Sequence, residues 1–484
     1  MTTTRFGPRS GRRPANRQTT AGRLLAILAT ATLLAGAAAC TRPADETEQG
    51  GSVEAGAGSG TGTTAAPGGG GNRLDQGSFG DLTEVCGEGA GGGAEETGLT
   101  ADQIHLGTVT DKGSAERPGL TQEMYDAGVA FAAWCNEHGG IQGREVVIDD
   151  LDAKLFDYGQ RMAEACQQDF ALVGGGGVFD SQGIDTRVNC GLPNIAGYIV
   201  SPAAGVADLQ VQPVPNPVYE YNGASYRWLH EAHPDATNYG ILWVNLDGPA
   251  TVREQAIEGV EKLGYDVVYD EQYRPIGETG WRGFVQQMRD ADVQVFEMVG
   301  EPENMVALQS AMQTEGWYPD FTVLQPNFVD EKFAEEGASS MSETTYMRSA
   351  FPTFDMADEA PAMADYLELM DRYNPEGKVA FLGAQGLSAF LLTAVAANEC
   401  GADLSRACVL EKATAQADWT AGGLHSKQTP GNTVATRCSL MIHATSEGFE
   451  YDKDLTGPND GFYNCDEKNV VTLTNDYGVP KPAA

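Results

Sequence analysis

The sequence predicts an α/β protein with two lobes, each built on a parallel sheet, that are joined by a multi-strand hinge. Short apolar runs alternate with amphipathic segments over about residues 104–198 and again over about residues 240–324, which is typical of βαβ units. Between these blocks, residues 212–217 (QPVPNP) carry alternate prolines, which favour an extended crossover. The chain of 484 residues is also longer than one hydrophobic core usually serves.

The first block opens with a strand over residues 104–110 and continues with a helix. The apolar stripe of this helix consists of Leu120, Met124, Ala127, Phe131 and Trp134. Gly139 and Gly140 end the helix, and later strands are expected at residues 145–148, 170–173 and 194–198. Strands that alternate with helices in this way predict a Rossmann-like lobe.

The second block repeats the pattern, with strands expected at residues 240–244, 266–269, 293–299 and 321–324. A second crossover is expected at residues 346–353, followed by helices over 357–373 and 383–400 that return to the first lobe. The predicted boundaries are therefore 94–217 plus 352–425 for lobe 1, 218–351 plus 426–465 for lobe 2, and 466–484 for a C-terminal tail. Hinge closure around a solute suits such an architecture.

The N-terminus has the features of an export signal over residues 1–39. Its basic head contains Arg5, Arg9, Arg12, Arg13, Arg17 and Arg23, and its apolar run, residues 24–39, is too short to span a membrane. The run ends in Ala37-Ala38-Ala39-Cys40, which resembles the lipoprotein signal box, so Cys40 is expected to carry a lipid anchor. The alternative is an ordinary signal peptide with a chance cysteine. Residues 40–93 are rich in Gly and acidic residues and are expected to form a flexible tether.

The charge of the chain restricts its partners. Its 68 acidic and 31 basic residues give a formal net charge of −37. Nucleic acids and anionic lipid surfaces require cationic patches, so we expect neither as a partner and expect membrane attachment through the lipid only. The carboxylates show no D-x-D-x-D-G cluster, which disfavours a role as a cation store.

The cysteines also indicate export, because an even number outside the cytosol favours disulfides. Besides Cys40 there are eight, and no C-x-x-C occurs. Their order along the chain favours the pairs Cys86–Cys135, Cys166–Cys190, Cys400–Cys408 and Cys438–Cys465.

Several segments resemble a known family, the type I periplasmic solute-binding proteins of the branched-chain amino acid (leucine/isoleucine/valine) class. Residues 136–144 (NEHGGIQGR) are similar to the family's N-x-x-GGI-x-GR turn, and the strand after them ends in Asp149-Asp150. Residues 279–284 (TGWRGF) resemble its T-D-F segment and precede a V-x-V-F-x-x-V-G strand. The resemblance covers about residues 100–465.

The resemblance implies an extracytoplasmic receptor that captures a small polar solute, an amino acid or related compound, and delivers it to the permease of an ABC transporter. It implies a monomer without a cofactor, held by lipid at the outer face of the cytoplasmic membrane. An alternative keeps the fold and makes the protein the ligand-sensing subunit of a receptor, because fold alone does not fix function.

Ligands of open α/β sheets bind outside the carboxyl ends of the strands, which gives the candidate binding residues. They are Arg117, Asp180, Ser181 and Tyr198 in lobe 1 and Asp247, Glu301 and Asn327 in lobe 2. Arg117 is suited to an anionic group and the acids to an ammonium. Structural alternatives remain: Arg117 as a surface charge, Asp180 and Ser181 as caps of the following helix, and Glu301 as a partner of a helix dipole.

An enzyme is disfavoured because no catalytic pattern occurs. The six histidines form no H-E-x-x-H motif. His230 and His233 are three residues apart on an expected helix, but flanking acids favour a solvated surface over a metal site. Residues 386–390 (GLSAF) lack the last glycine of a nucleophile elbow, which disfavours a secreted hydrolase. We therefore expect no catalytic residue and no metal.

Overall fold

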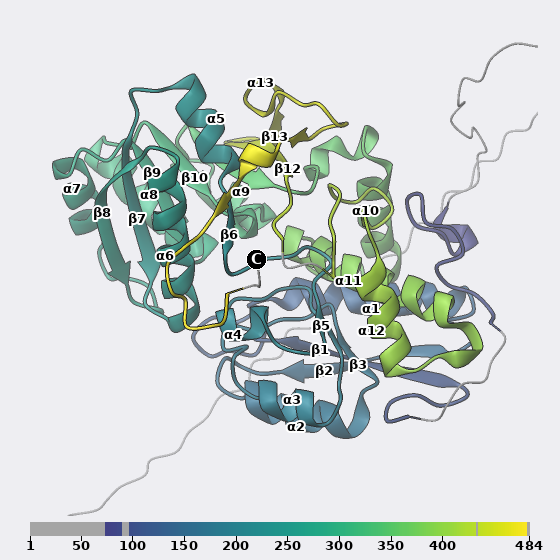
Figure 1. Cartoon of the computed structure of the whole chain (residues 1–484). Helices are drawn as coiled ribbons and strands as arrows, with labels where there is room; N and C mark the ends of the chain where they lie inside the picture. Colours follow the sequence, from purple (N-terminus) through teal and green to yellow (C-terminus); the bar gives the residue numbers. More distant parts are fainter. Residues whose placement is uncertain (1–72, 90–95, 432–433, 482–484) are drawn as a thin grey trace, which may run out of the picture. The chain divides into compact units, whose positions relative to one another are not determined.

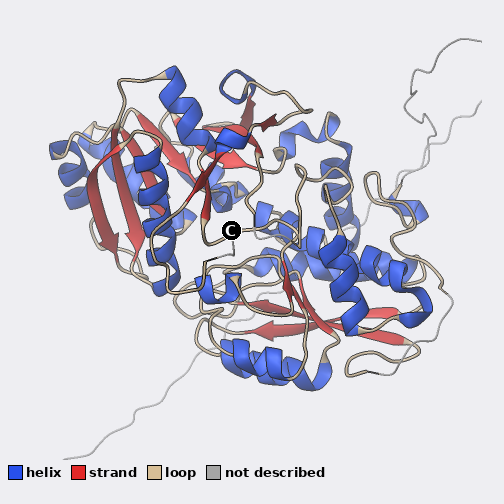
Figure 2. Cartoon of the chain, viewed as in Figure 1, coloured by secondary structure: helices blue, strands red, loops and turns tan. Residues whose placement is uncertain are grey.

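The computed structural model describes residues 73–89, 96–431 and 434–481. The predicted signal peptide, Cys40 and most of the predicted tether lie outside the described residues. Within the described part, two parallel sheets form the centres of two lobes (Figures 1 and 2). This arrangement confirms the predicted α/β class.

The sheet of lobe 1 has five strands in the order β2-β1-β3-β4-β5, and all neighbours are parallel. They are β1 (Gln103–Thr110), β2 (Glu145–Asp152), β3 (Ala171–Val173), β4 (Asn194–Ile195) and β5 (Gln210–Val211). The helices are α1 (Gln122–Glu137), α2 (Tyr158–Gln168), α3 (Ile184–Asn189), α4 (Pro202–Gly205), α10 (Pro361–Tyr373), α11 (Phe381–Cys400) and α12 (Arg406–Ala415). Helices α2 and α3 cover one face of the sheet, whereas α1, α11 and α12 cover the other (Figure 1).

The sheet of lobe 2 has the order β13-β12-β11-β10-β9-β7-β8. Strand β12 pairs antiparallel with both β11 and β13, and the other neighbours in this order are parallel. Its strands are β7 (Asn238–Val244), β8 (Asp266–Tyr273), β9 (Val295–Val299), β10 (Phe321–Leu324), β11 (Thr345–Ser349), β12 (Cys438–Thr445) and β13 (Gly448–Asp452). Its helices are α5 (Ala224–Ala232), α6 (Asp247–Lys262), α7 (Arg282–Asp290), α8 (Pro302–Glu315), α9 (Glu331–Gly337) and α13 (Lys453–Thr456). Strand β9 is buried along its whole length, as expected for a central parallel strand.

Over the described residues from 96 onward, the chain passes between the lobes at three places. The first crossover lies between β5 and the short strand β6 (Glu220–Asn222), and the third precedes β12. The second crossover is shorter than predicted, because residues 345–349 form β11 and pair with β10 and β12. Strand β15 (Val470–Thr472) pairs antiparallel with β6, so part of the predicted C-terminal tail is built into the hinge.

The predicted tether boundary at residue 93 is wrong for the described residues 73–89. Leu74 and Phe79 are fully buried. The indole N–H of Trp134 in α1 donates to the Leu74 carbonyl at 2.9 Å, and the amide of Gly80 donates to Asp365 of α10 at 2.8 Å. The sequence did not indicate that residues 73–89 pack on lobe 1. The segment has a low average hydrophobicity, because only a few of its side chains make the contact.

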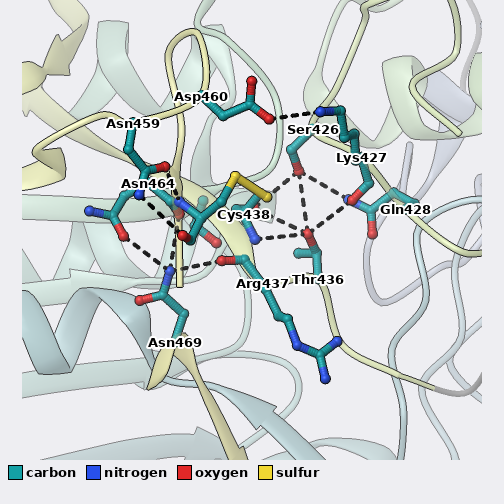
Figure 3. Close-up of a disulfide and its surroundings, with 12 residues drawn as sticks. Ser426, Lys427, Gln428, Thr436, Arg437, Cys438, Asn459, Asp460, Asn464 and Asn469 are labelled. Carbon is teal, nitrogen blue, oxygen red and sulfur yellow. Dashed lines mark hydrogen bonds and ion pairs between the residues drawn. A yellow bond between two sulfur atoms is a disulfide. The ribbon is translucent and has the colours of Figure 1, made fainter. Parts of the chain in front are cut away.

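The four predicted disulfides are confirmed: Cys86–Cys135, Cys166–Cys190, Cys400–Cys408 and Cys438–Cys465. The first holds the 73–89 segment against α1, and the last joins the start of β12 to the strand β14 (Asn464–Cys465). Figure 3 shows the last disulfide among side chains of the third crossover, including Ser426 and Thr436.

Helix α11 is the central helix of lobe 1. Among the described residues, one helical stretch, Phe381–Asp403, is long and apolar enough to cross a membrane. Its apolar window is 78% buried inside the protein. The helix packs against α1, where the rings of Phe390 and Phe131 stack at 5.4 Å between centroids. The apolar character of α11 therefore reflects its place in the core.

Candidate functional site

The candidate site lies where the carboxyl ends of the parallel strands of both lobes meet, which we call the strand-end junction. Lobe 1 contributes the loops after β1, β3 and β4, and lobe 2 contributes the loops after β7, β9 and β10. The lobes touch here: a Cβ atom on Gly248, at the start of α6, would lie 2.3 Å from Cγ1 of Val200. Glycine at position 248 thus permits the close approach of α6 to lobe 1.

Arg117 links the two lobes through charge. Its backbone amide donates to the Ser114 hydroxyl at 3.1 Å, which fixes the loop after β1. The guanidinium forms an ion pair with Glu301, and its Nη2 donates to Oε2 of Glu303 at 3.0 Å. Glu301 is the N-cap residue of α8 and Glu303 lies in its first turn. The structure therefore brings together two predicted residues, Arg117 and Glu301, with a third that had no predicted binding role.

Asp180 shapes the loop after β4. It is buried, and its carboxylate accepts hydrogen bonds from the amides of Val200 at 2.7 Å and Ser201 at 3.0 Å. Burial raises the pKa of Asp180 to about 6, although these hydrogen bonds act in the opposite direction. The helix-cap alternative is wrong for the next helix, α3. Its N-cap residue is Gly183, and no side chain caps its first turn by a hydrogen bond. The neighbouring Ser181 is exposed.

Tyr198 follows β4, just before the residues whose amides donate to Asp180. The residue is partly exposed. Burial of its phenol raises the pKa to about 12, the charge of Asp180 raises this pKa further, and the charge of Arg117 lowers it. The Gly-rich run after β3 makes room for this residue: a Cβ on Gly176 would lie 2.5 Å from the Tyr198 carbonyl oxygen. An aromatic ring close to a cation and an acid is suited to contact a polar solute.

The remaining predicted residues of lobe 2 have two different environments. Asp247 is exposed and begins α6. Asn327 donates from Nδ2 to the carbonyl of Gly300 at 2.9 Å, which holds the β9–α8 loop in place. Among the described residues, no group of three or more His, Cys, Asp or Glu side chains gathers to bind a metal.

Two cavities in the described part of the chain bear on where a ligand could bind. One of about 10 Å³ lies behind Tyr198 and Asp180, between α2, α3 and the loop after β4, and has room for a water molecule only. The other, of about 500 Å³, lies between α9 and the β12–β13 turn of lobe 2 and the side chains of Phe354, Leu367 and Val379. Its size suits a small ligand, but it contains none of the predicted binding residues.

The sequence reasoning missed a buried polar cluster around the middle of β9 in the lobe 2 sheet. Glu297 in β9 accepts hydrogen bonds from Tyr226, from Tyr239 at 2.7 Å and from Gln325 at 3.1 Å. Burial raises the pKa of the Glu297 carboxyl, and the same hydrogen bonds lower it in part. The nearby Arg348, in β11, lay inside the segment predicted as a crossover. A single arginine in a strand with no other charged residue was the signal that could have marked it.

The fold and this junction define a two-lobed binding protein. A family model described as periplasmic binding protein matches residues 198–448, slightly more than half of the 484 residues. The chain belongs to this family, and its class is that of the extracytoplasmic solute-binding proteins of ABC transporters. No curated protein matches the sequence.

Solved structures share the fold at low sequence identity. A fatty acid ABC transporter substrate-binding protein from Thermomonospora curvata has a TM-score of 0.64 and 15% identity, over 78% of this chain and 96% of that one. The branched-chain amino acid substrate-binding protein from Streptococcus pneumoniae, in complex with isoleucine, has a TM-score of 0.59 and 17% identity, over 72% and 99%. A leucine-binding protein from Thermotoga maritima has a TM-score of 0.59 and 12% identity, over 72% and 97%.

Proposed function

We propose that this protein captures a small polar solute, an amino acid or a related compound, at the strand-end junction and delivers it to the permease of an ABC importer without chemical change. The observation that supports this most is the contact of Arg117 in lobe 1 with Glu301 in lobe 2. Charged groups from both lobes converge at the edge where parallel sheets bind ligands. A solute bound between them would contact both lobes at once.

The binding set in this proposal is Arg117, Asp180, Ser181, Tyr198, Asp247, Glu301 and Asn327. Tyr198 and the Arg117–Glu301 pair are its centre, because they follow strand ends and are partly exposed. Asp180 acts by positioning the 198–201 loop, since its carboxylate oxygens already accept amide hydrogens. The names of similar structures include both amino acid and fatty acid binders, so the solute panel must cover both classes.

Thermal unfolding of residues 73–484 with a panel of amino acids, amides, short peptides, sugars, purines and alkanoates tests the proposal. A solute at one hundred times its dissociation constant adds about 2.7 kcal/mol of stability. Stabilisation by one chemical class that is reduced in Tyr198→Phe and Glu301→Gln, but not in the exposed control Glu450→Gln, would support it. Stabilisation unchanged in both variants would place the solute elsewhere.

The proposal includes a lipid anchor on Cys40 and a permease as partner. Cleavage of the precursor that is sensitive to a lipoprotein signal peptidase inhibitor, and absent in Cys40→Ala, would support the anchor. Co-purification of a membrane permease with the full chain would support transport. Co-purification of a kinase instead would favour the sensing alternative.

A further inference from the structure

Arg348 lies near the carboxyl end of β11, at the end of the lobe 2 strands where the strand-end junction is formed. It is the fourth of five residues in β11 and pairs in register with Met441 of β12. Tyr346, two residues earlier, packs with the cluster on the α5 and α6 side of the sheet, so Arg348 projects from the same face. This position also lies next to the hinge, because β11 leads directly into the second crossover.

The guanidinium of Arg348 has an unusual environment. Burial lowers its pKa, while Tyr221 of the hinge strand β6 and Glu297 of β9 raise it. The side chain nevertheless keeps accessible surface. Within the described part of the chain, it makes no hydrogen bond or ion pair. A desolvated guanidinium with five donors and no protein acceptor is rare in folded proteins.

Glu297, the acid of this cluster, accepts no hydrogen bond from Arg348. Glu297 directs its oxygens to two tyrosine hydroxyls and to the amide of Gln325. Each of these groups donates to the carboxyl, so three of its roughly four acceptor positions are occupied. Arg348 therefore remains available to an external acceptor that enters from the accessible side.

Arg117, the arginine first expected to hold an anion, is in the opposite situation. Two carboxylates, Glu301 and Glu303, already neutralise it. An anionic group that approached Arg117 would meet these acids as well. Of the two arginines, Arg117 has carboxylate partners at ion-pair distance, whereas Arg348 has none among the described residues.

We propose that Arg348 binds an anionic group of the solute, a carboxylate or phosphate, at the hinge end of the junction. This inference rests on the proposed function and specifies the solute class. A planar guanidinium forms two parallel hydrogen bonds to such a group. Because Arg348 is followed within a residue by the second crossover, the bound anion lies against the hinge.

The test uses the full chain and isothermal titration with paired probes. The probes are the amino acids, C2–C10 mono- and dicarboxylates, sugar phosphates and inorganic phosphate, each organic acid with its uncharged amide or parent sugar. We expect binding of an acid and not of its uncharged counterpart. Arg348→Gln should weaken that binding about 10- to 100-fold, and Arg348→Lys less.

Arg282→Gln is the matched control, because Arg282 is 71% exposed and its side chain pairs with Glu315 at the surface. Equal binding by wild type, Arg348→Gln and Arg282→Gln would overturn the role of Arg348 while the proposed function stands. Binding of uncharged probes only would overturn the anionic class. The absence of binding by any probe or member of the solute panel would count against both proposals. Circular dichroism and the unfolding midpoint establish that each variant is folded.

Discussion

Arg117 in the loop after β1 and Glu301 at the start of α8 form an ion pair that joins two segments far apart in the sequence. Both side chains are mostly shielded, with 22% and 28% of their surface exposed. Glu303 adds a second carboxylate to the same guanidinium. The two lobes are thus connected by charge at the edge where the solute is proposed to bind.

A double-mutant cycle measures this link. Arg117→Gln and Glu301→Gln should each destabilise the protein, and their coupling free energy should be about 1 kcal/mol at low salt. The coupling should fall in 1 M NaCl, because the pair is partly accessible to ions. Urea unfolding of wild type, both single variants and the double variant gives the value. Strict additivity of the two substitutions would show that the pair contributes no stability.

The periodic elements were predictable because their signal is local. The residues expected for β10 coincide with the strand, and α1 contains most of the expected stripe. Elements that depend on a distant partner were missed. Strand β6 has three residues and exists because β15, far along the chain, supplies its hydrogen bonds. The 73–89 segment was missed for the same reason, since Cys135 and Trp134 hold it in place.

The candidate site was predictable in position and less so in detail. Strand-end logic placed Arg117 and Glu301 at one edge, but it gave no indication that they pair with each other. Asp180 was predicted to contact the ligand, whereas its carboxylate accepts hydrogen bonds from the backbone amides of Val200 and Ser201 in the loop after β4. Such pairings depend on tertiary distances that a single sequence does not contain.

Asp169 should make stability depend on pH. Burial, together with the neighbouring Asp149 carboxylate, raises its pKa to about 9; Glu164 adds to this and Arg406 opposes it. The folded state then keeps a proton that the unfolded chain loses near pH 4, so stability falls as pH rises from about 4 to about 9. In Asp169→Asn this slope should be absent, and its stability relative to wild type should rise by about 1 kcal/mol or more between pH 5 and pH 8.

Urea unfolding at pH 5, 6.5 and 8 measures this difference. The exposed Asp403→Asn is the control and should follow the wild-type curve. His105 contacts Asp149 at 2.8 Å, so His105→Gln separates the effect of this contact from that of Asp169. Parallel curves for wild type and Asp169→Asn would contradict the assignment.

Each disulfide should add to the free energy of unfolding by an amount that increases with the length of the loop it closes. The pair Cys438–Cys465 spans 27 residues and Cys400–Cys408 spans 8. The chain-entropy model predicts losses of about 3.5 kcal/mol and about 2.5 kcal/mol when each pair is replaced by serines. Unfolding midpoints in urea, measured without reductant, give the comparison. A larger loss for the shorter loop would mean that local packing, not chain entropy, sets the order.

Glu258 should anchor the C-terminal segment to α6. Its buried carboxylate accepts hydrogen bonds from the Tyr477 hydroxyl at 2.7 Å, the Asn475 amide at 3.0 Å and the Lys262 ammonium at 2.6 Å. Burial alone would raise the pKa of Glu258, but the hydrogen bonds from Lys262, Tyr477 and Thr474 lower it below its usual range. This contribution to stability is therefore complete above about pH 5 and is lost as the pH falls below the unfolded value near 4.3.

Glu258→Gln should cost about 2 kcal/mol at pH 7, and the difference from wild type should shrink below pH 4. Limited trypsin digestion should cleave the variant faster after Lys468, because the segment that follows it loses its anchor. Glu261→Gln, an exposed substitution on the same helix, is the control and should behave like wild type. Equal protease resistance of the two variants would mean that the β6–β15 pairing alone holds the segment, and Glu258 would then be a local helix contact only.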